Sequence, residues 1–429
     1  MLIGAKVYRN KIYKGNYGSR ISLSSKEIQN FLASVRAHIQ HTIEINQRPD
    51  ALYHAYNILH IDIQSETASV ENLGVMLEGQ VAVLSSKAIA PKQALKTLKA
   101  LRNSDLYCPK RNSYILYADK ALPTFLQFNR IKKSDALAIP LLAHLIEKEN
   151  NELIEFSSDD CLRFNRSIRN RFELDDSLNA LAQKSDFKNL VEANRSSIHA
   201  LYEATFNHHS FTGRSGSMFS YEGLGCIYWH MVSKLMLAIQ EITLDASNTE
   251  AFKTLSSHYY DVQDGLGFRR TAAQYGAFTP DAYSHTPAHA GAQQPGLTGM
   301  VKEGLLCRFG ELGVEISKQR IRFNPSLLRE AELLKENTEC TIIRTDGLEK
   351  TYSLLTDSLL FTLIQVPVIY KRTSNPLPVI KVYFNDDTHQ VIDSDTLPVE
   401  LSQLILNRDS NVDYIHVEQP SERFLSDTH

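Results

Sequence analysis

Residues 265–299 read GLGFRRTAAQYGAFTPDAYSHTPAHAGAQQPGLTG, a polar stretch that is rich in glycine, carries histidines and is interrupted by prolines. The sequence before it is amphipathic, and VKEGLLCRFGELGVEI (301–316) follows it directly, so we expect helices on both sides. A loop this long is uncommon inside a compact domain and usually binds something. The stretch therefore predicts a helical body that holds a functional loop, not a linker between domains.

The composition is that of an ordinary globular protein with a large core. The chain has 429 residues, 43% of them hydrophobic, which is enough for more than one domain. Its formal net charge is -3, and its Lys and Arg residues are scattered singly. Because no basic stripe is present to follow a phosphate backbone, we expect no nucleic-acid partner.

The cysteines and the longest apolar run indicate a cytoplasmic protein with no membrane segment. Five cysteines lie far apart without a CxxC pair, which favours free thiols over disulfides. The N-terminus lacks the apolar run of a signal peptide. The stretch LLFTLIQVPVIY (359–370) is too short to span a bilayer and contains Gln365 and Pro367.

Helical signals dominate the N-terminal part. Ser24 and Glu27 have capping-box spacing, and the apolar residues behind them recur at helical intervals: Ile28, Phe31, Leu32, Val35, Ile39 and Ile43. This first helix should end at RPDALYHAYN (48–57), because Pro49 disfavours helical geometry at the residue before it. Further helical segments are predicted over 70–86 and from Pro91 to 103.

The middle and the end of the chain show different patterns of predicted secondary structure. Residues 103–170 mix short strand-like runs with a helical one, which indicates an insertion or subdomain. Helical periodicity returns afterwards and includes MFSYEGLGCIYWHMVSKLMLAIQEI (218–242). Beyond about 330, short β-branched runs are separated by turn residues. We therefore predict a mainly α protein, with a helical domain over 1–330 and a small antiparallel β domain over 331–429.

The long loop offers a set of groups suited to an anion. His285, His289 and Gln293 provide polar side chains, and Thr298 and Gly299 stand just before the expected helix, whose first amides favour a phosphate. The spacing of the two histidines would also suit a metal, but Pro287 lies between them and no acidic ligand is near, so we predict no metal site. The alternative is a structural loop whose polar groups satisfy one another.

Two further groups of residues are candidates for carbohydrate chemistry. Tyr221, Glu222, Trp229 and His230 combine aromatic faces with a carboxylate, as sugar sites do, although Tyr and Trp on a helix stripe more often lie in a core. The second group lies near the break at Pro49 and supplies titratable and aromatic side chains for an acid catalyst and its substrate: Asp50, Tyr53, His54, Glu71 and Glu78. A solvated or capping role is the alternative for each carboxylate.

Three segments resemble a known family. SGSMFSYEGLGCIYWHMVSKL (215–235), SHTPAHAGAQQPGLTGMVKEGLLCRFGELGVEI (284–316) and IRFNPSLL (321–328) are similar to the C-terminal half of the (α/α)6 barrel in large bacterial glycoside hydrolase-like proteins. Those proteins are related to the inverting phosphorylases that include cellobiose phosphorylase and the β-1,3-oligoglucan phosphorylases. The resemblance implies a partial (α/α)6 toroid followed by a small antiparallel β-sandwich. It also implies that Thr298, Gly299 and His285 or His289 bind phosphate.

The resemblance implies inverting phosphorolysis of a β-linked oligosaccharide to a sugar 1-phosphate, with inorganic phosphate as co-substrate and no cofactor. The family's general acid lies in a DWND-like motif that is absent here, so the acid is expected to be Asp50, Glu78 or a group elsewhere. The alternatives are an inverting hydrolase, with Glu222 or Asp281 as second carboxylate, and a non-catalytic carbohydrate-binding fragment. The expected partners are an oligosaccharide, phosphate, and a missing N-terminal half or further copies of the chain.

Overall fold

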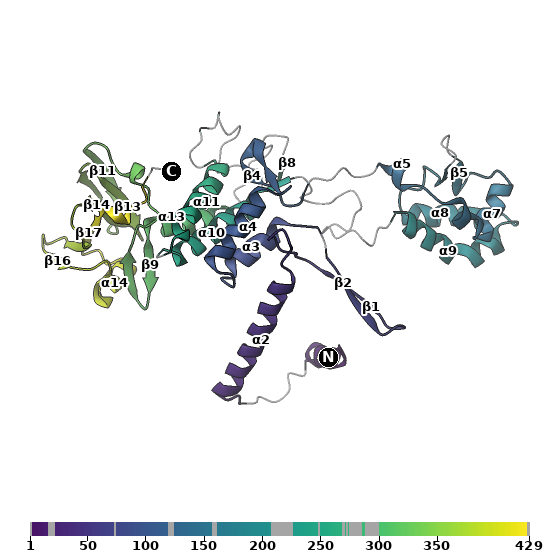
Figure 1. The fold of residues 1–429 in the computed structure, drawn as a ribbon, viewed down its shortest axis with the longest axis horizontal. Helices are drawn as coiled ribbons and strands as arrows, with labels where there is room; N and C mark the ends of the chain where they lie inside the picture. Colours follow the sequence, from purple (N-terminus) through teal and green to yellow (C-terminus); the bar gives the residue numbers. More distant parts are fainter. Residues whose placement is uncertain are drawn as a thin grey trace. The chain divides into compact units, whose positions relative to one another are not determined.

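In a computed structural model of the chain, the residues whose structure is described are 2–15, 22–72, 74–118, 124–156, 161–206, 226–247, 249–267, 271, 273, 285–287 and 300–426 (Figure 1). The chain forms two compact units. The first consists of Met1–Ser104, Ser233–Gln263 and Val301–His429, and the second of Asp105–Val232 and Asp264–Met300. Each unit is described by itself.

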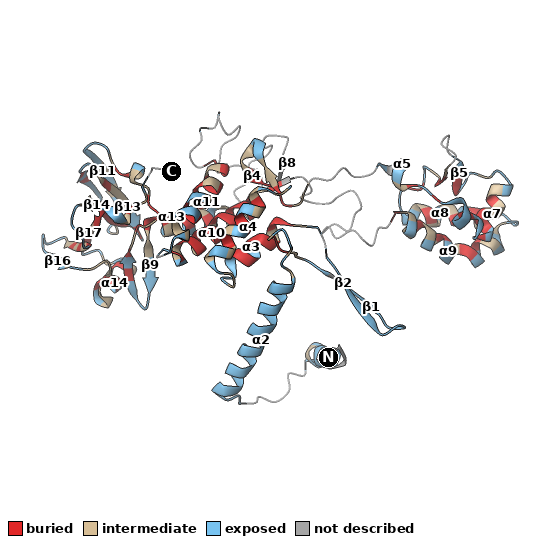
Figure 2. Ribbon diagram, viewed as in Figure 1, coloured by how far each residue is buried: buried red, intermediate tan, exposed pale blue. Residues whose placement is uncertain are grey.

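The first unit begins with helices and a hairpin that lie on the surface: α1 (Leu2–Tyr13), α2 (Ser25–Ile45), β1 (Ile58–Asp62) and β2 (Thr67–Glu71). The Ser24 hydroxyl accepts the Glu27 N–H at 3.2 Å, and the Glu27 carboxylate accepts the Ser24 N–H at 2.7 Å. This capping box confirms the start of the helix that the sequence predicts. No residue of α2 is buried (Figure 2).

The helical part of this unit consists of α3 (Leu77–Ser85), α4 (Pro91–Arg102), α10 (Trp229–Asp245, within the unit from Ser233), α11 (Ala251–Gly265, within it to Gln263) and α13 (Met300–Leu312, within it from Val301). Pro91 occupies the first turn of α4, as predicted. Helices α10 and α13 approach closely: the Gln240 amide donates to the Cys307 carbonyl at 2.7 Å, and a Cβ on Gly310 would meet the Gln240 side chain at 2.2 Å. Glycine at 310 therefore permits this packing.

The rest of the first unit contains a five-stranded sheet in the order β13-β14-β17-β15-β16, beside two hairpins. The strands of the sheet are β13 (Ser358–Leu363), β14 (Val366–Thr373), β15 (Val379–Phe384), β16 (His389–Ile392) and β17 (Val412–Pro420). The hairpins are β9 (Val314–Ser317) with β10 (Arg320–Phe323), and β11 (Thr338–Ile343) with β12 (Glu349–Leu354). Helix α14 (Val399–Leu406) lies between β16 and β17 in the chain, and its crossover lets β17 run parallel to β14.

The second unit holds a small domain with its own hydrophobic core. Its helices and strands are α5 (Phe125–Phe128), α6 (Lys133–Leu137), α7 (Pro140–Glu147), β5 (Ile154–Phe156), β6 (Leu162–Phe164), α8 (Arg171–Ala182) and α9 (Lys188–Phe206). Outside this domain the unit contains β3 (Tyr107–Cys108), β4 (Ser113–Tyr114), β7 (Cys226–Tyr228) and β8 (His285–Pro287). The helical run and the strand-like runs expected within 103–170 are confirmed, for example by α7 and β5.

The predicted fold class, a partial toroid followed by an antiparallel sandwich, is wrong. The described residues form helices with many small sheets and show neither a clear toroid nor a sandwich. α2 has no buried residue and so cannot be one layer of a double ring, and the largest sheet contains a parallel strand pair. Among the described residues, no helix combines the length and the apolar character that a bilayer crossing requires.

Candidate functional site

Two stretches that the sequence marks as candidate sites meet in one ladder of the second unit. Strand β7 pairs antiparallel with β8, so that Ile227 lies opposite Thr286 and Tyr228 opposite His285. The two strands are almost 60 residues apart in the chain, and their register contains three residue pairs. The backbone of His285–Pro287, where the predicted phosphate-binding residues begin, therefore runs beside Cys226–Tyr228.

The residues at the end of β7 have different environments. Tyr228 Oη lies 3.2 Å from His230 Nδ1, and the two rings meet edge to face at 5.7 Å between centroids. Trp229 is 1% exposed, so no face of its indole is open to a sugar ring. The burial of Trp229 favours a role in the hydrophobic core, which the sequence left as the alternative to sugar binding. His230 is half-buried, and its imidazole lies beside the Tyr228 hydroxyl.

Several predicted residues lie outside the described residues: Tyr221, Glu222, Asp281, His289, Gln293, Thr298 and Gly299. Their roles stay predictions. Helix α13 begins at Met300, directly after the Thr298-Gly299 pair, which confirms that a helix starts where the sequence expects one. The N-terminal amides of such a helix favour an anion, but this alone does not identify a ligand.

The RPDALYHAYN segment is a rigid turn in the first unit. The Arg48 guanidinium donates to both carboxylate oxygens of Asp50, at 3.1–3.2 Å from Nε and 2.9 Å from the terminal nitrogen. Asp50 also accepts the Leu52 N–H at 3.1 Å. The hydrogen bonds from Arg48 lower the pKa of Asp50. A carboxylate held in its charged form turns the backbone here and is a poor proton donor near neutral pH.

Two buried polar side chains of the neighbouring helices hold this turn in place. The Gln80 amide, on α3, accepts the Tyr53 N–H and donates to the Tyr53 carbonyl, both at 2.9 Å. The Thr97 hydroxyl, on α4, donates to the Ala51 carbonyl at 3.0 Å. Gly79 allows the close approach, since a Cβ there would lie 2.9 Å from the Ala55 Cβ. Side-chain hydrogen bonds from both helices therefore hold the backbone of the turn in place.

The backbone of the turn contains two residues in the left-handed region, Ala51 at φ 66° and Tyr56 at φ 58°. Non-glycine residues seldom adopt this conformation, and it persists where the surrounding structure imposes it, as at many binding sites. His54 lies between them. Its Nδ1 atom is buried and has no hydrogen-bond partner among the described residues. Such an atom needs an explanation, and a ligand hydroxyl would supply one.

The other candidates near the turn are less suited to binding. Tyr53 is 4% exposed, and burial raises the pKa of its hydroxyl. Glu78 is half-buried in the first turn of α3, one residue before Gly79. Glu71 lies on the exposed hairpin, where its carboxylate is 2.9 Å from His60 Nε2. Of the carboxylates in this group, Asp50 lies in the turn itself, and Glu78 lies on α3 next to Gly79, which packs on the turn.

Sequence reasoning missed a buried acidic network on α13. Glu311 is 4% exposed and accepts hydrogen bonds from the Tyr259 hydroxyl at 2.6 Å and the Gln263 amide at 2.5 Å. Arg308 pairs with it at 2.7 Å. Burial, and then the nearby Glu311 charge, raise the pKa of Tyr259 well above its usual value. The signal was the spacing of Glu303, Cys307 and Glu311, which puts two acids on one face of the helix with a cysteine between them.

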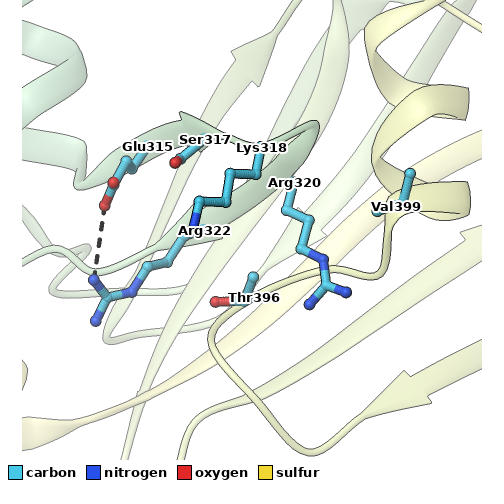
Figure 3. A pocket seen from close by; sticks show the side chains of 7 residues that line it. All are labelled: Glu315, Ser317, Lys318, Arg320, Arg322, Thr396 and Val399. Carbon is cyan, nitrogen blue, oxygen red and sulfur yellow. Dashed lines mark ion pairs between the residues drawn. The ribbon is translucent and has the colours of Figure 1, made fainter. Parts of the chain in front are cut away.

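The structure also contains an open groove of about 450 Å³ between the β9–β10 hairpin and the start of α14 (Figure 3). It is lined by Glu315, Ser317, Lys318, Arg320, Arg322, Thr396 and Val399. Arg322 is engaged there, 3.7 Å from the Glu315 carboxylate and 3.1 Å from that of Asp395. The hairpin residues of the lining are exposed, so water is not excluded as it would be in a catalytic site. None of the predicted residues that the structure describes lines this groove.

Within the described residues, no three His, Cys, Asp or Glu side chains converge in the manner of metal ligands. His289 lies outside those residues, so the prediction that the long loop holds no metal remains untested.

Comparison with known proteins identifies one part of the chain. Residues 122–209 match the sequence model described as GH149 phosphorylase insertion domain 2. This range contains the small domain of the second unit and its separate core. A search of curated protein sequences finds no match. The match covers 88 of the 429 residues and supports a relationship of this part of the chain to GH149 phosphorylases, while the relationship to cellobiose or β-1,3-oligoglucan phosphorylases stays a prediction.

Proposed function

We propose that this chain takes part in the inverting phosphorolysis of a β-linked oligosaccharide, which releases a sugar 1-phosphate. The observation that carries the proposal is the β7–β8 ladder, which pairs the backbone of His285–Pro287 with that of Cys226–Tyr228. The match of residues 122–209 to a GH149 phosphorylase insertion domain supports the same class of reaction.

In this reaction, phosphate replaces the activated water of an inverting hydrolase. A phosphate oxygen attacks the anomeric carbon from the face opposite the leaving sugar, the glycosidic C–O bond breaks, and a carboxylic acid transfers its proton to the leaving oxygen. His285, His289, Gln293, Thr298 and Gly299 would hold the phosphate, together with the first amides of α13. The positive end of that helix would offset the charge that the phosphate brings.

We assign the acid to Glu78 in preference to Asp50. Asp50 is held as a carboxylate by Arg48, and its lowered pKa opposes proton donation. Glu78 lies next to Gly79 and near Gln80, which both contact the turn, and within that turn the His54 Nδ1 atom is buried with no hydrogen-bond partner among the described residues. Glu78→Gln should therefore reduce turnover by about 100-fold or more, while Asp50→Asn should act mainly on stability. Equal losses of turnover in the two variants would remove this preference.

The test incubates the full chain with β-linked gluco-oligosaccharides, with and without inorganic phosphate, and measures sugar 1-phosphate. We expect product only with phosphate, and about a 100-fold or larger loss in Thr298→Ala, since removal of one anion-binding donor costs this much in comparable sites. Thr341→Ala, on the exposed face of β11, is the matched control and should keep full turnover. Activity that survives Thr298→Ala would place the phosphate elsewhere.

The alternatives give different outcomes in the same assay. Free sugar formed without phosphate would identify an inverting hydrolase, for which Glu222 or Asp281 would be the second carboxylate. Calorimetry separates the remaining possibility. Oligosaccharide binding with neither phosphate binding nor turnover would identify a non-catalytic carbohydrate-binding chain and would contradict the proposal.

A further inference from the structure

Four charged side chains line the groove beside the β9–β10 hairpin: Glu315, Lys318, Arg320 and Arg322. The carboxylates of Glu315 and Asp395 lie 3.7 Å and 3.1 Å from Arg322, so the charge of this guanidinium is offset within the chain. Among the described residues, no carboxylate lies within 4.0 Å of the Lys318 ammonium or the Arg320 guanidinium. The groove therefore presents two cationic groups that carry no ion pair there.

The register of the hairpin explains why one arginine is paired and the other is not. Arg322 lies opposite Glu315, whereas Arg320 lies opposite Ser317. Both arginines are exposed and alternate with buried apolar residues, so they share the outer face of β10. Figure 3 shows Arg322 reaching toward Glu315 and Arg320 extending away from it. The cross-strand neighbour of Arg320 is therefore a hydroxyl, which does not offset its charge.

Hydrogen bonds that do not involve these two cations fix the walls of the groove. The Gln403 amide on α14 donates to the Gln319 side chain at 3.0 Å, and the Ser402 hydroxyl accepts the Ile321 N–H at 3.1 Å. The Leu397 N–H donates to the Ile321 carbonyl at 2.9 Å. These bonds join the hairpin to α14 and to the loop before it. The groove thus has its shape before a ligand arrives, and little loss of chain entropy opposes binding.

The hydrogen-bond donors of the groove suit a phosphate group. Arg320 presents a planar fork of N–H donors, which matches two phosphate oxygens at once, and Lys318 adds a compact positive charge. The Ser317 hydroxyl, opposite Arg320 on the same face, is a further donor. Two cations and a hydroxyl together offset the charge of a phosphate monoester, which carries nearly two negative charges at neutral pH.

The other lining groups and the volume favour an ester with hydroxyl groups over the bare ion. The Thr396 hydroxyl donates to the Asp395 carboxylate at 2.8 Å, so its oxygen is left to accept a ligand hydroxyl. Val399 adds an apolar wall. A groove of about 450 Å³ has the size of small-molecule sites and is larger than a phosphate ion. We propose that this groove binds a small phosphate monoester that carries hydroxyl groups, the class of a phosphorylated sugar.

The exposure of the groove sets the expected strength of binding. Lys318 and Arg320 are exposed, so water screens their charges and binding should weaken as salt is added. We expect a dissociation constant on the order of 0.1–1 mM, as for a small ligand held by a few exposed polar contacts. This inference does not rest on the proposed function, because none of the residues assigned to phosphate attack lines the groove.

The first test measures the groove directly through the reactivity of Lys318. The full chain is acylated briefly with and without glucose 6-phosphate, and mass spectrometry measures the modification of each lysine. At about 10 mM ester, tenfold or more above the expected dissociation constant, modification of Lys318 should slow about fivefold or more. Lys335, exposed elsewhere in the same unit, is the control and should not change, and glucose should protect neither lysine. If Lys318 is unreactive in the free chain, another segment fills the groove, and if the ester leaves it unprotected, the ester does not bind. Either result would overturn the proposal.

The second test removes the guanidinium. Arg320→Gln should raise the ester concentration needed to protect Lys318 by about tenfold or more, because a charge-assisted hydrogen bond is lost. Arg166→Gln, at an exposed arginine of the small domain, is the matched control and should protect like wild type. Since Arg320 is exposed, its variant should unfold at the same denaturant concentration as wild type. Equal protection in Arg320→Gln and wild type would overturn the site, and equal protection by inorganic phosphate and by the ester would overturn the assignment to an ester.

Discussion

Helices α2 and α9 carry the same kind of sequence pattern and have opposite environments. α9, 19 residues long, buries Val191, Asn194, Ile198, Tyr202 and Phe206 at helical spacing. α2 is 21 residues long, has an equally regular stripe and buries nothing. The difference lies in what surrounds them, because α9 closes a core with α7, α8 and the β5–β6 hairpin. A periodic pattern thus identifies the face of a helix that seeks cover, and not what covers it.

The comparison also separates two sources of helix stability. α9 gains its stability from tertiary burial, which stabilises most helices in proteins more than their intrinsic propensity does. α2 depends on local devices: the Ser24–Glu27 capping box, a Gln40–Glu44 hydrogen bond at 2.9 Å and the Thr42 hydroxyl bonded to the His38 carbonyl at 2.8 Å. Variants that remove one or the other contribution should therefore behave differently in the two regions.

The largest effect is expected in the core of the small domain. Phe164 is fully buried and packs on the rings of Tyr202 at 5.0 Å and Phe206 at 6.1 Å between centroids. Phe164→Ala should destabilise this domain by about 3–5 kcal/mol, because it removes buried area and leaves a cavity. Denaturant unfolding followed by hydrogen exchange at α9 measures this. A cost below about 1 kcal/mol would show that the core does not stabilise α9.

A smaller effect is expected at the start of α2. Ser24→Ala removes the hydroxyl that caps the helix, which typically costs about 1 kcal/mol of helix stability. Because α2 buries nothing, this loss should appear as about fivefold faster amide exchange in the first turn of α2. The unfolding midpoint of the small domain should stay unchanged. A matching shift of that midpoint would mean that α2 packs on the domain.

Local signals in the sequence predicted much of this structure. The capping box located α2 and Pro91 located α4. The β-branched runs located β11, β12, β15 and β17, covered β13 and β14 as one run, and missed β16. The second helical segment was less accurate. It was expected over 70–86, but β2 extends to Glu71 and α3 begins only at Leu77. Asn72 and Gly74 stand between the two elements, but the predicted helix of 70–86 ran through them.

The arrangement of the elements was harder to predict than the elements. The parallel pairing of β14 with β17 follows from the crossover through α14, and short β-branched runs do not reveal the direction of their neighbours. The meeting of β7 and β8 is equally non-local. For the site, residue types indicated a turn around Asp50 but not its ion pair with Arg48, which depends on side-chain geometry. The candidate acid could therefore be assessed only in three dimensions.

Asp175 on α8 pairs with Arg195 and His199 on α9. We expect these partly exposed ion pairs to add less than about 1 kcal/mol to the free energy of unfolding, by an amount that depends on pH. Burial would raise the pKa of Asp175, but His199 at 2.9 Å and Arg195 at 2.8 Å outweigh it and leave the pKa lowered. A lowered pKa stabilises the fold above the unfolded value of about 3.9, and this is lost as pH falls through the folded pKa. Asp175→Asn should thus unfold more easily than wild type at pH 6, and the gap should narrow as the pH falls below about 3.9. A gap that widened in acid would contradict this.

The smallest effect is expected on the exposed stripe itself, and it bears most directly on the contrast with α9. Phe31 is 66% exposed, so Phe31→Ala removes little buried area, and alanine has the higher helix propensity. The free energy of unfolding by denaturant should change by no more than about 0.5 kcal/mol. A loss of more than about 1 kcal/mol would show that α2 packs on its own chain, and the difference between α2 and α9 would then disappear.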